Sequence, residues 1–184
     1  MIQDLQLVDR LFTGWRETLG GDYEGYRNHV YRVVNLTHRF HPEMSEEEFT
    51  LLQVAAAYHD VGIWLDNTLD YLEPSADRAG GFLVRHIDLG KSSLAEKQRL
   101  VRAMIYQHHA IRPARDPDLP LVDAFRKADW TDVLMGAYAF GLPRKEVKAI
   151  QQAFPDAGFH MRLLQLAGHR LKTNPFKPLP MLRW

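Results

Sequence analysis

The sequence predicts an all-α fold, a single-domain helical bundle with a central buried helix. Three observations predict it. The chain has 184 residues, which is enough for one domain with a substantial core and short for two. Apolar residues recur at helical spacing, and no segment shows the alternation typical of a strand. Residues 49–65, FTLLQVAAAYHDVGIWL, are apolar nearly all the way round, and a helix of that kind belongs inside a domain.

The first three predicted helices have clear starts and stops. Apolar residues at helical spacing predict a helix over residues 5–19, which two glycines stop. A second helix is predicted over residues 22–41 and ends before a proline. Ser45 and Glu48 have the spacing of a capping box, which begins the central helix through residues 49–65.

The remaining helices follow without a linker or an internal repeat between them. Ser75 begins one helix, and Ser92 or Ser93 begins the next, each with an apolar face. Three more helices are predicted over residues 121–138, 143–154 and 157–171. We therefore expect residues 1–184 to form one domain.

The composition restricts the partners and the kinds of site. Lysine plus arginine and aspartate plus glutamate both number 23, so the net charge is zero, which argues against a nucleic-acid partner. No apolar run reaches the length of about 18 residues that suggests a membrane span, and the N-terminus lacks the features of a signal peptide. We expect a cytoplasmic protein without a membrane partner. The chain has no cysteine, so any metal would be held by imidazole and carboxylate groups.

Five predicted helices each place a potential metal ligand on an apolar face. These residues are His29, the pair His59 and Asp60, His86, His108 and Asp129. Burying an ionised aspartate is costly unless it is paired, hydrogen-bonded or bound to a metal. Imidazole and carboxylate together suit one or two divalent ions of Mn, Fe, Co, Ni, Zn or Mg. His109 competes with His108 for one position, and His108 is favoured because it is in phase with Met104 and Ile105.

The order H…HD…D resembles the HD-domain superfamily of metal-dependent phosphohydrolases. It is carried by His29 in NHVYRVVN, by His59 and Asp60 in AAAYHDVGIW, and by Asp129 in RKADWTDV. The resemblance covers about residues 22–138, so the N-terminal helix and the C-terminal helices are additions. It implies a metal bound by these four residues. A subset of the superfamily adds histidines for a second metal, and His86 and His108 fall where those would be expected.

The resemblance implies a hydrolase for a phosphate mono- or diester, acting on a small phosphorylated molecule that is nucleotide-like or sugar-like. Metal-activated water would be the nucleophile, and His59 and Asp60 would be the catalytic pair that positions the ions. Five further residues could contact the substrate or support the ligands, namely His109, Arg32, Arg78, Lys127 and Trp64.

Two other functions fit the same residues. A di-iron oxygenase of the inositol-oxygenase-like branch would use six inward ligands to activate dioxygen. A non-catalytic helical module would instead hold the histidines and aspartates in a buried hydrogen-bonded network. No chemistry is assigned to the remaining histidines, which are His38, His41, His160 and His169.

Overall fold

The computed structural model describes residues 1–87, 93–113 and 120–173. All regular structure in these residues is helical, which confirms the all-α prediction. The elements are α1 (Gln6–Leu19), the 3-10 turn η1 (Gly20–Asp22), α2 (Tyr23–Phe40), α3 (Glu46–Tyr58), α4 (Gly62–Leu65), α5 (Leu72–His86), α6 (Leu94–Gln107), α7 (Pro120–Val133), α8 (Arg144–Ala153) and α9 (Phe159–Thr173). No helix among the described residues combines the length and the apolar character that a membrane crossing requires.

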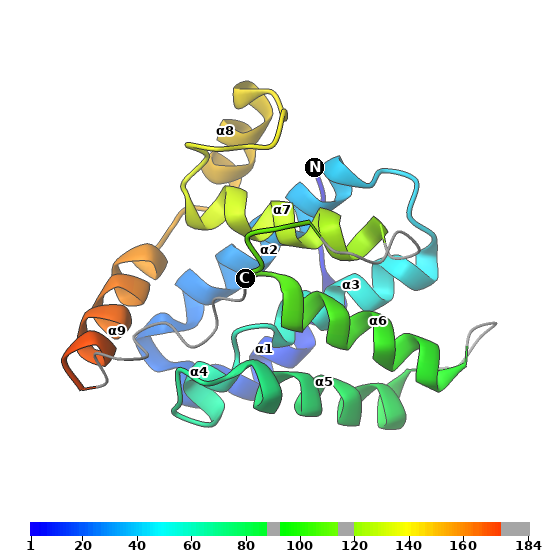
Figure 1. Cartoon of the computed structure of the whole chain (residues 1–184), viewed down its shortest axis with the longest axis horizontal. Coiled ribbons are helices and arrows are strands. Elements are labelled where there is room, and N and C mark those ends of the chain that lie inside the picture. Colours follow the sequence, from blue (N-terminus) through cyan, green and yellow to red (C-terminus); the bar gives the residue numbers. More distant parts are fainter. Residues whose placement is uncertain (88–92, 114–119, 174–184) are drawn as a thin grey trace.

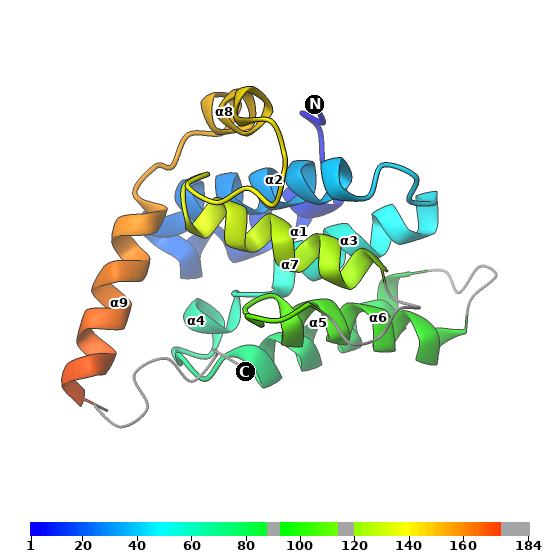
Figure 2. The same ribbon diagram turned by 45° about the horizontal axis from the view of Figure 1, so that its top comes forward.

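The helices pack in two main pairs that meet at α3. Helix α2 lies along α7, and α5 lies along α6 (Figure 1). Helix α3 contacts α2 from one pair and both helices of the other, and α1 also packs against it. Helices α8 and α9 lie at the outside of this arrangement, as the turned view also shows (Figure 2). The space enclosed between the pairs is therefore lined by α2, α3, α6 and α7.

Helix α3 is the central buried helix that the sequence predicts. Every residue from Leu51 to Tyr58 is buried, so no side of this stretch faces solvent. The predicted capping box is present, because Ser45 Oγ accepts from the Glu48 backbone N–H and the Glu48 carboxylate accepts from the Ser45 backbone N–H. A matching box at Ser93 and Glu96 begins α6.

The prediction of one continuous helix over residues 49–65 is wrong, because the helix ends at Tyr58. The chain then turns before α4, and the Ile63 N–H donates to the Asp60 carbonyl, three residues back instead of four, at 3.0 Å. The Gly62 N–H donates to Ser75 Oγ at 3.1 Å. A Cβ on Gly62 would lie 3.0 Å from both Ser75 Oγ and Tyr71 Cβ, so glycine lets the start of α5 approach this turn.

Two other helix boundaries differ from the prediction. Helix α5 begins at Leu72, before Ser75, because Pro74 falls in its first turn, where a missing N–H leaves no hydrogen bond unmade. Helix α7 ends at Val133, before Tyr138, because Met135 and Gly136 adopt positive φ angles of 51° and 76°.

Candidate metal centre

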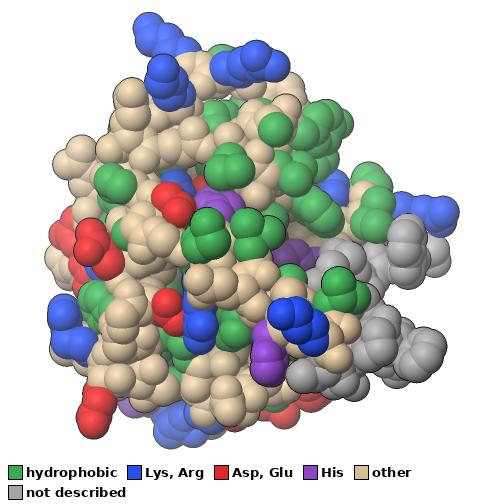
Figure 3. Space-filling model, turned by 90° about the vertical axis from the view of Figure 1, so that its left-hand side faces the viewer, with side chains coloured by type: hydrophobic (Ala, Val, Ile, Leu, Met, Phe, Trp, Pro, Cys, Tyr) green, Lys and Arg blue, Asp and Glu red, His purple; other side chains and the backbone are tan. Residues whose placement is uncertain are grey.

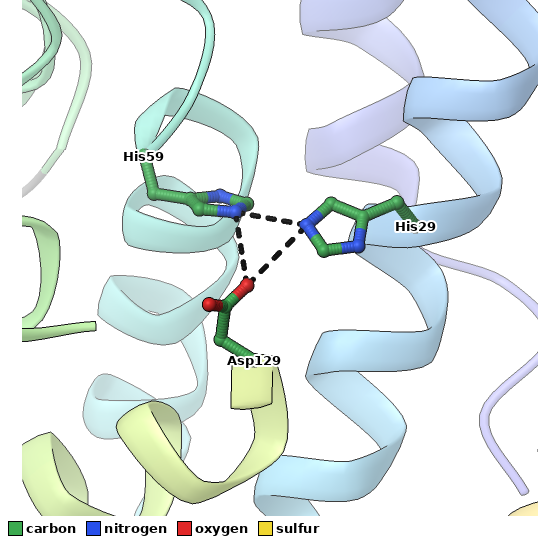
Figure 4. A group of neighbouring side chains, drawn as sticks. All are labelled: His29, His59 and Asp129. Atoms are coloured by element: carbon green, nitrogen blue, oxygen red, sulfur yellow. Dashed lines mark hydrogen bonds and ion pairs between the residues drawn. The ribbon is translucent and has the colours of Figure 1, made fainter. Parts of the chain in front are cut away.

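Three side chains from separate elements meet in the interior. His29 comes from α2, His59 from the turn after α3, and Asp129 from α7 (Figure 4). The two imidazole Nε2 atoms lie 3.0 Å apart. Asp129 Oδ1 lies 3.5 Å from His29 Nε2 and 3.6 Å from His59 Nε2. All three residues have 0% exposure, so the group is closed to bulk solvent on these sides.

Asp60 and His108 extend this group toward α6. Asp60 Oδ2 lies 3.4 Å from His59 Nε2, and Asp60 Oδ1 lies 3.3 Å from His108 Nε2. Both residues are buried. Because the chain turns after Tyr58, the successive side chains of His59 and Asp60 face the same interior space.

His109 joins the group from its more open side. Its Nδ1 lies 3.3 Å from Asp129 Oδ2, and its Nε2 lies 2.9 Å from the Tyr71 hydroxyl. The side chain of His109 is 15% exposed, whereas those of Asp60 and Asp129 are 4% and 0% exposed. The sequence left His108 and His109 as competitors for one position, and the structure brings both to the group.

The prediction that His86 faces inward is wrong. His86 is exposed at the end of α5, where its ring lies against Phe82 with the centroids 4.8 Å apart. Tyr71, which contacts His109, precedes the other end of the same helix. A helix of this length separates its ends by roughly 20 Å, so His86 lies too far along α5 to join the group. Helical periodicity indicated which face of the helix carries His86, but not how far along the helix axis it lies from the group.

Backbone and carboxylate acceptors fix the tautomers of three histidines. The Nδ1 atoms of His59 and His108 donate to the carbonyls of Ala56 and Ile105, each at 2.7 Å. His29 Nδ1 donates to Asp132 Oδ2, also at 2.7 Å. A neutral ring that donates through Nδ1 carries a lone pair on Nε2. In their neutral forms the three rings therefore direct Nε2 lone pairs into the group, which is how histidines are oriented around metals.

The electrostatics of the group favour a cation. Burial lowers the pKa of His59, but the Asp60 and Asp129 carboxylates outweigh burial and raise it to about 9. Burial raises the pKa of Asp60, but His59 and His108 outweigh it and hold that pKa well below its usual range. The lone pairs of His29 and His59 repel one another at 3.0 Å unless a proton or a metal ion lies between them.

Several buried polar atoms of the group lack hydrogen-bond partners within the described residues. They are Asp60 Oδ1, both carboxylate oxygens of Asp129, and His108 Nε2. Buried acceptors without partners are rare and costly. One or two divalent ions would satisfy them, and imidazole with carboxylate is a donor set that such ions accept. The residues therefore fit a metal. Three overlapping groups each offer ligand atoms that lie within 4.8 Å of one another inside the group. These groups are His29, His59 and Asp129; His59, Asp60 and His108; and His108, His109 and Asp129.

The sequence model of the HD domain family matches residues 26–134, more than half of the chain. The chain belongs to the HD domain family. The match contains all six members of the buried group, and divalent-metal binding is a property of HD domains. No curated protein and no solved structure matches the chain. The predicted family membership is thus confirmed, and the ligand role of each residue stays a prediction.

Asp132 is a residue of this HD domain that the sequence reasoning missed. It is 1% exposed, and its carboxylate accepts from His29 Nδ1 and from Arg32 Nε, the latter at 2.6 Å. Burial raises the pKa of Asp132, but the His29 hydrogen bond and the Arg32 charge outweigh it and bring the pKa to about 2. The available signal was its position three residues after Asp129, which places both carboxylates on the same side of α7.

Tyr71 and Phe159 were also missed. Tyr71 lies in the connection before α5, where no periodicity reports which side chains point inward. Phe159 begins α9, outside the residues that carry the motif, and its ring stacks on the His29 imidazole with centroids 4.2 Å apart.

Of the other predicted site residues, one supports a predicted ligand and three have partners elsewhere. Arg32 is 2% exposed and is paired with Asp132, so it supports His29 indirectly. Arg78 pairs with Asp66 at the surface. Lys127 pairs with Asp123, and Trp64 Nε1 donates to Asp22 Oδ2.

One face of the molecule lies on the side of α9. Hydrophobic side chains surround histidine and carboxylate groups that are only partly visible from that side (Figure 3). His109, with 15% side-chain exposure, is the most exposed member of the group.

Proposed function

We propose that this HD domain is a metal-dependent phosphohydrolase that acts on a small phosphate ester. The observation that carries the proposal is the convergence of His29, His59, Asp60 and Asp129, with lone pairs and unpartnered carboxylate oxygens directed at one another. These four residues would hold one ion. His108 and His109, together with the two carboxylates, could hold a second beside it.

A divalent ion in this position supplies an acidified water and neutralises the charge of phosphoryl oxygens. The chain's own residues hold and shield it. His29 is fixed by Asp132, and His59 is fixed by the Ala56 carbonyl. Phe125 packs edge-on against His59, with centroids 5.6 Å apart, and excludes water from that side.

The surroundings support a small substrate. The Arg32 guanidinium is buried against Asp132, so it is not available to pair with a phosphate. The charge of the ester would fall mainly on the bound ions. His109 is the most exposed member of the group, and Tyr71 beside it is 1% exposed, so we expect a substrate to approach through a narrow space there. A nucleotide-like or sugar-like phosphate fits this approach better than a large polymer.

Metal analysis followed by a substrate screen tests the proposal. Protein purified without added metal would be assayed for bound ions, and phosphate release would be measured from mono- and diesters with Mn²⁺, Co²⁺, Ni²⁺, Zn²⁺, Fe²⁺ and Mg²⁺. Asp60→Asn should lose cation binding and phosphate release. Asp77→Asn is the matched control, because Asp77 is an exposed carboxylate paired with Arg102 on the surface. Release that survives equally in both variants would contradict the proposal.

One observation supports oxygenase chemistry as a second candidate. Six ligand-type side chains form overlapping sets around the interior, which is the number that a two-iron centre needs. Iron that co-purifies with the chain, together with substrate-dependent oxygen consumption and no phosphate release, would favour this candidate. A chain that binds no ion and keeps its melting temperature after chelation would instead be the non-catalytic helical module.

A further inference from the structure

A short segment outside the family match lies directly on the metal centre. Residues 154–160, which we call the α8–α9 segment, connect α8 to α9 and follow the 26–134 match in the chain. The turned view shows this connection descending from α8 to the outer side of α2 (Figure 2). Phe154 and Phe159 are buried, with 8% and 2% exposure, so the segment is packed onto the domain.

The segment covers one face of a predicted ligand. The Phe159 ring lies 4.2 Å from the His29 ring, centroid to centroid, with 17° between the planes. A parallel ring at this distance restricts rotation of the imidazole, whose Nε2 points into the group. Phe159 therefore constrains the direction of the His29 lone pair.

The segment is also linked through Arg32 to Asp132, the residue that supports His29. Arg32 Nη1 donates to the carbonyls of Phe154 and Pro155, at 3.0 and 3.2 Å. The same guanidinium contacts Asp132 through Nε and Nη2, at 2.6 and 2.9 Å. Since Asp132 accepts from His29 Nδ1, the guanidinium ties the backbone of the segment to the ring.

A second link reaches the backbone of α7. His160 Nε2 donates to the Asp132 carbonyl at 2.9 Å, and Asp156 contacts the other ring nitrogen. Asp132 is therefore held at both its side chain and its carbonyl by groups that contact or belong to the α8–α9 segment. No chemistry was expected of His160 from the sequence, and this contact gives it a structural role.

The packing of the segment against α2 depends on Gly25 and Asn28. A Cβ on Gly25 would lie 3.1 Å from the Ala157 carbonyl oxygen and 3.2 Å from the Phe159 backbone nitrogen. Any side chain larger than hydrogen at Gly25 therefore presses on the segment. Asn28 Nδ2 donates to the Pro155 carbonyl at 2.9 Å and anchors the segment one turn further on.

We propose that the α8–α9 segment is a positioning element of the metal site, which sets the orientation of His29 through Phe159, Arg32 and Asp132. It does not touch the ion or the substrate. The inference rests on the proposed function, because it requires that His29 bind a cation. It adds that this domain would bind the cation more weakly if the segment were displaced.

The test compares three variants of the full chain. Gly25→Val presses on the segment, and Asn28→Ala removes one anchor without adding bulk. Gly14→Val is the matched control, because Gly14 is an exposed helical glycine at which an added Cβ would meet nothing within 4 Å. The dissociation constants of Mn²⁺, Co²⁺ and Zn²⁺ would be measured by calorimetry. Hydrogen exchange at residues 154–160 and the side-chain nitrogen resonances of His29 would be recorded without metal.

We expect Gly25→Val and Asn28→Ala to weaken cation binding about tenfold, within the range for groups that orient a ligand. Exchange at residues 154–160 should rise and the His29 resonances should move, while Gly14→Val matches the wild type. If Gly25→Val does not fold, Asn28→Ala decides the result alone.

Two outcomes would overturn the inference, and they differ in meaning. Folded variants with faster exchange at residues 154–160 but wild-type cation affinity would show that the segment only stabilises the fold. A wild-type chain that binds none of the three cations would remove the proposed function as well.

Discussion

Both ring nitrogens of His29 have a partner in the structure. Asp132 accepts from one of them, so replacing Asp132 is the main test at the scale of single residues. Its Nε2 faces the other predicted ligands, and its Nδ1 donates to Asp132. Burial lowers the pKa of His29, and the Asp132 carboxylate opposes this effect and fixes the tautomer of the ring, as such partners commonly do for metal-binding histidines. The chemistry of the site therefore extends beyond the H…HD…D residues.

Asp132→Asn should weaken cation binding about 10–100-fold. The amide keeps the size of the carboxylate but loses the charge that pairs with Arg32 and polarises His29. Isothermal titration with Mn²⁺ measures the effect, with Asp77→Asn as the exposed control. An unchanged affinity in Asp132→Asn would show that Asp132 serves only the fold.

Removal of His108 should affect cation binding, whereas removal of His86 should not. His108→Ala deletes an imidazole nitrogen that faces Asp60 at 3.3 Å, so the number of ions bound per chain, or their affinity, should fall. His86→Ala should leave both unchanged, because His86 is exposed at the far end of α5. Metal content after dialysis gives the comparison, and a loss in His86→Ala would contradict the position of His86 outside the group.

The sequence was informative where helical periodicity, or a run that is apolar on every side, indicates which side chains point inward. His29, His59, Asp60, His108 and Asp129 were predicted to point inward, and all five are buried. Periodicity says nothing of position along a helix axis, and His86 was misplaced for that reason. Contacts between segments distant in the chain, such as Phe159 on His29, carry no local signal at all.

At the scale of elements, the turn between α3 and α4 is the feature that the sequence did not reveal. The apolar run continues through it, so the pattern is that of one helix. The helix ends at Tyr58, and the turn that follows is packed closely, because Ser75 and Tyr71 approach the backbone at Gly62. That turn directs His59 and Asp60 to the same space.

Gly62→Ala should destabilise the fold by about 1–3 kcal/mol, the usual cost of an added methyl group in a packed interior. The new Cβ would lie 3.0 Å from Ser75 Oγ and Tyr71 Cβ. Gly14→Ala in α1 is the control and should be neutral or stabilising by up to about 1 kcal/mol. Urea unfolding curves measure both, and equal stability of the two variants would contradict the close packing at the turn.

The start of α6 offers a second test at this scale. Ser93 accepts from the Glu96 N–H at 3.2 Å and completes the capping box. Ser93→Ala should cost about 0.5–2 kcal/mol of stability. Urea unfolding would detect this, and cation affinity should stay unchanged because the cap lies at the opposite end of α6 from His108.

For the whole molecule, the predicted ligands come from four separate parts of the fold. They lie on α2, on the turn after α3, at the end of α6 and on α7. An ion held by all four would join the two helix pairs. The family match covers these parts, whereas the α8–α9 segment supports them from outside it.

Cation binding should therefore stabilise the whole domain. An ion at 100 times its dissociation constant contributes about 2.7 kcal/mol, which corresponds to a rise in melting temperature of roughly 5–10 °C for a domain of this size. Circular dichroism melts with and without a chelator measure the shift. Asp60→Asn should show none, and an equal shift in that variant would place the ion elsewhere.

Anomalous diffraction from crystals soaked in Mn²⁺ tests the central claim most directly, because it locates the ion. We expect an anomalous peak between His29 Nε2, His59 Nε2 and Asp129 Oδ1, within bonding distance of Asp60 as well. A second peak near His108 and His109 would indicate a two-ion centre. Well-ordered crystals with these side chains in place and no peak among them would contradict the account.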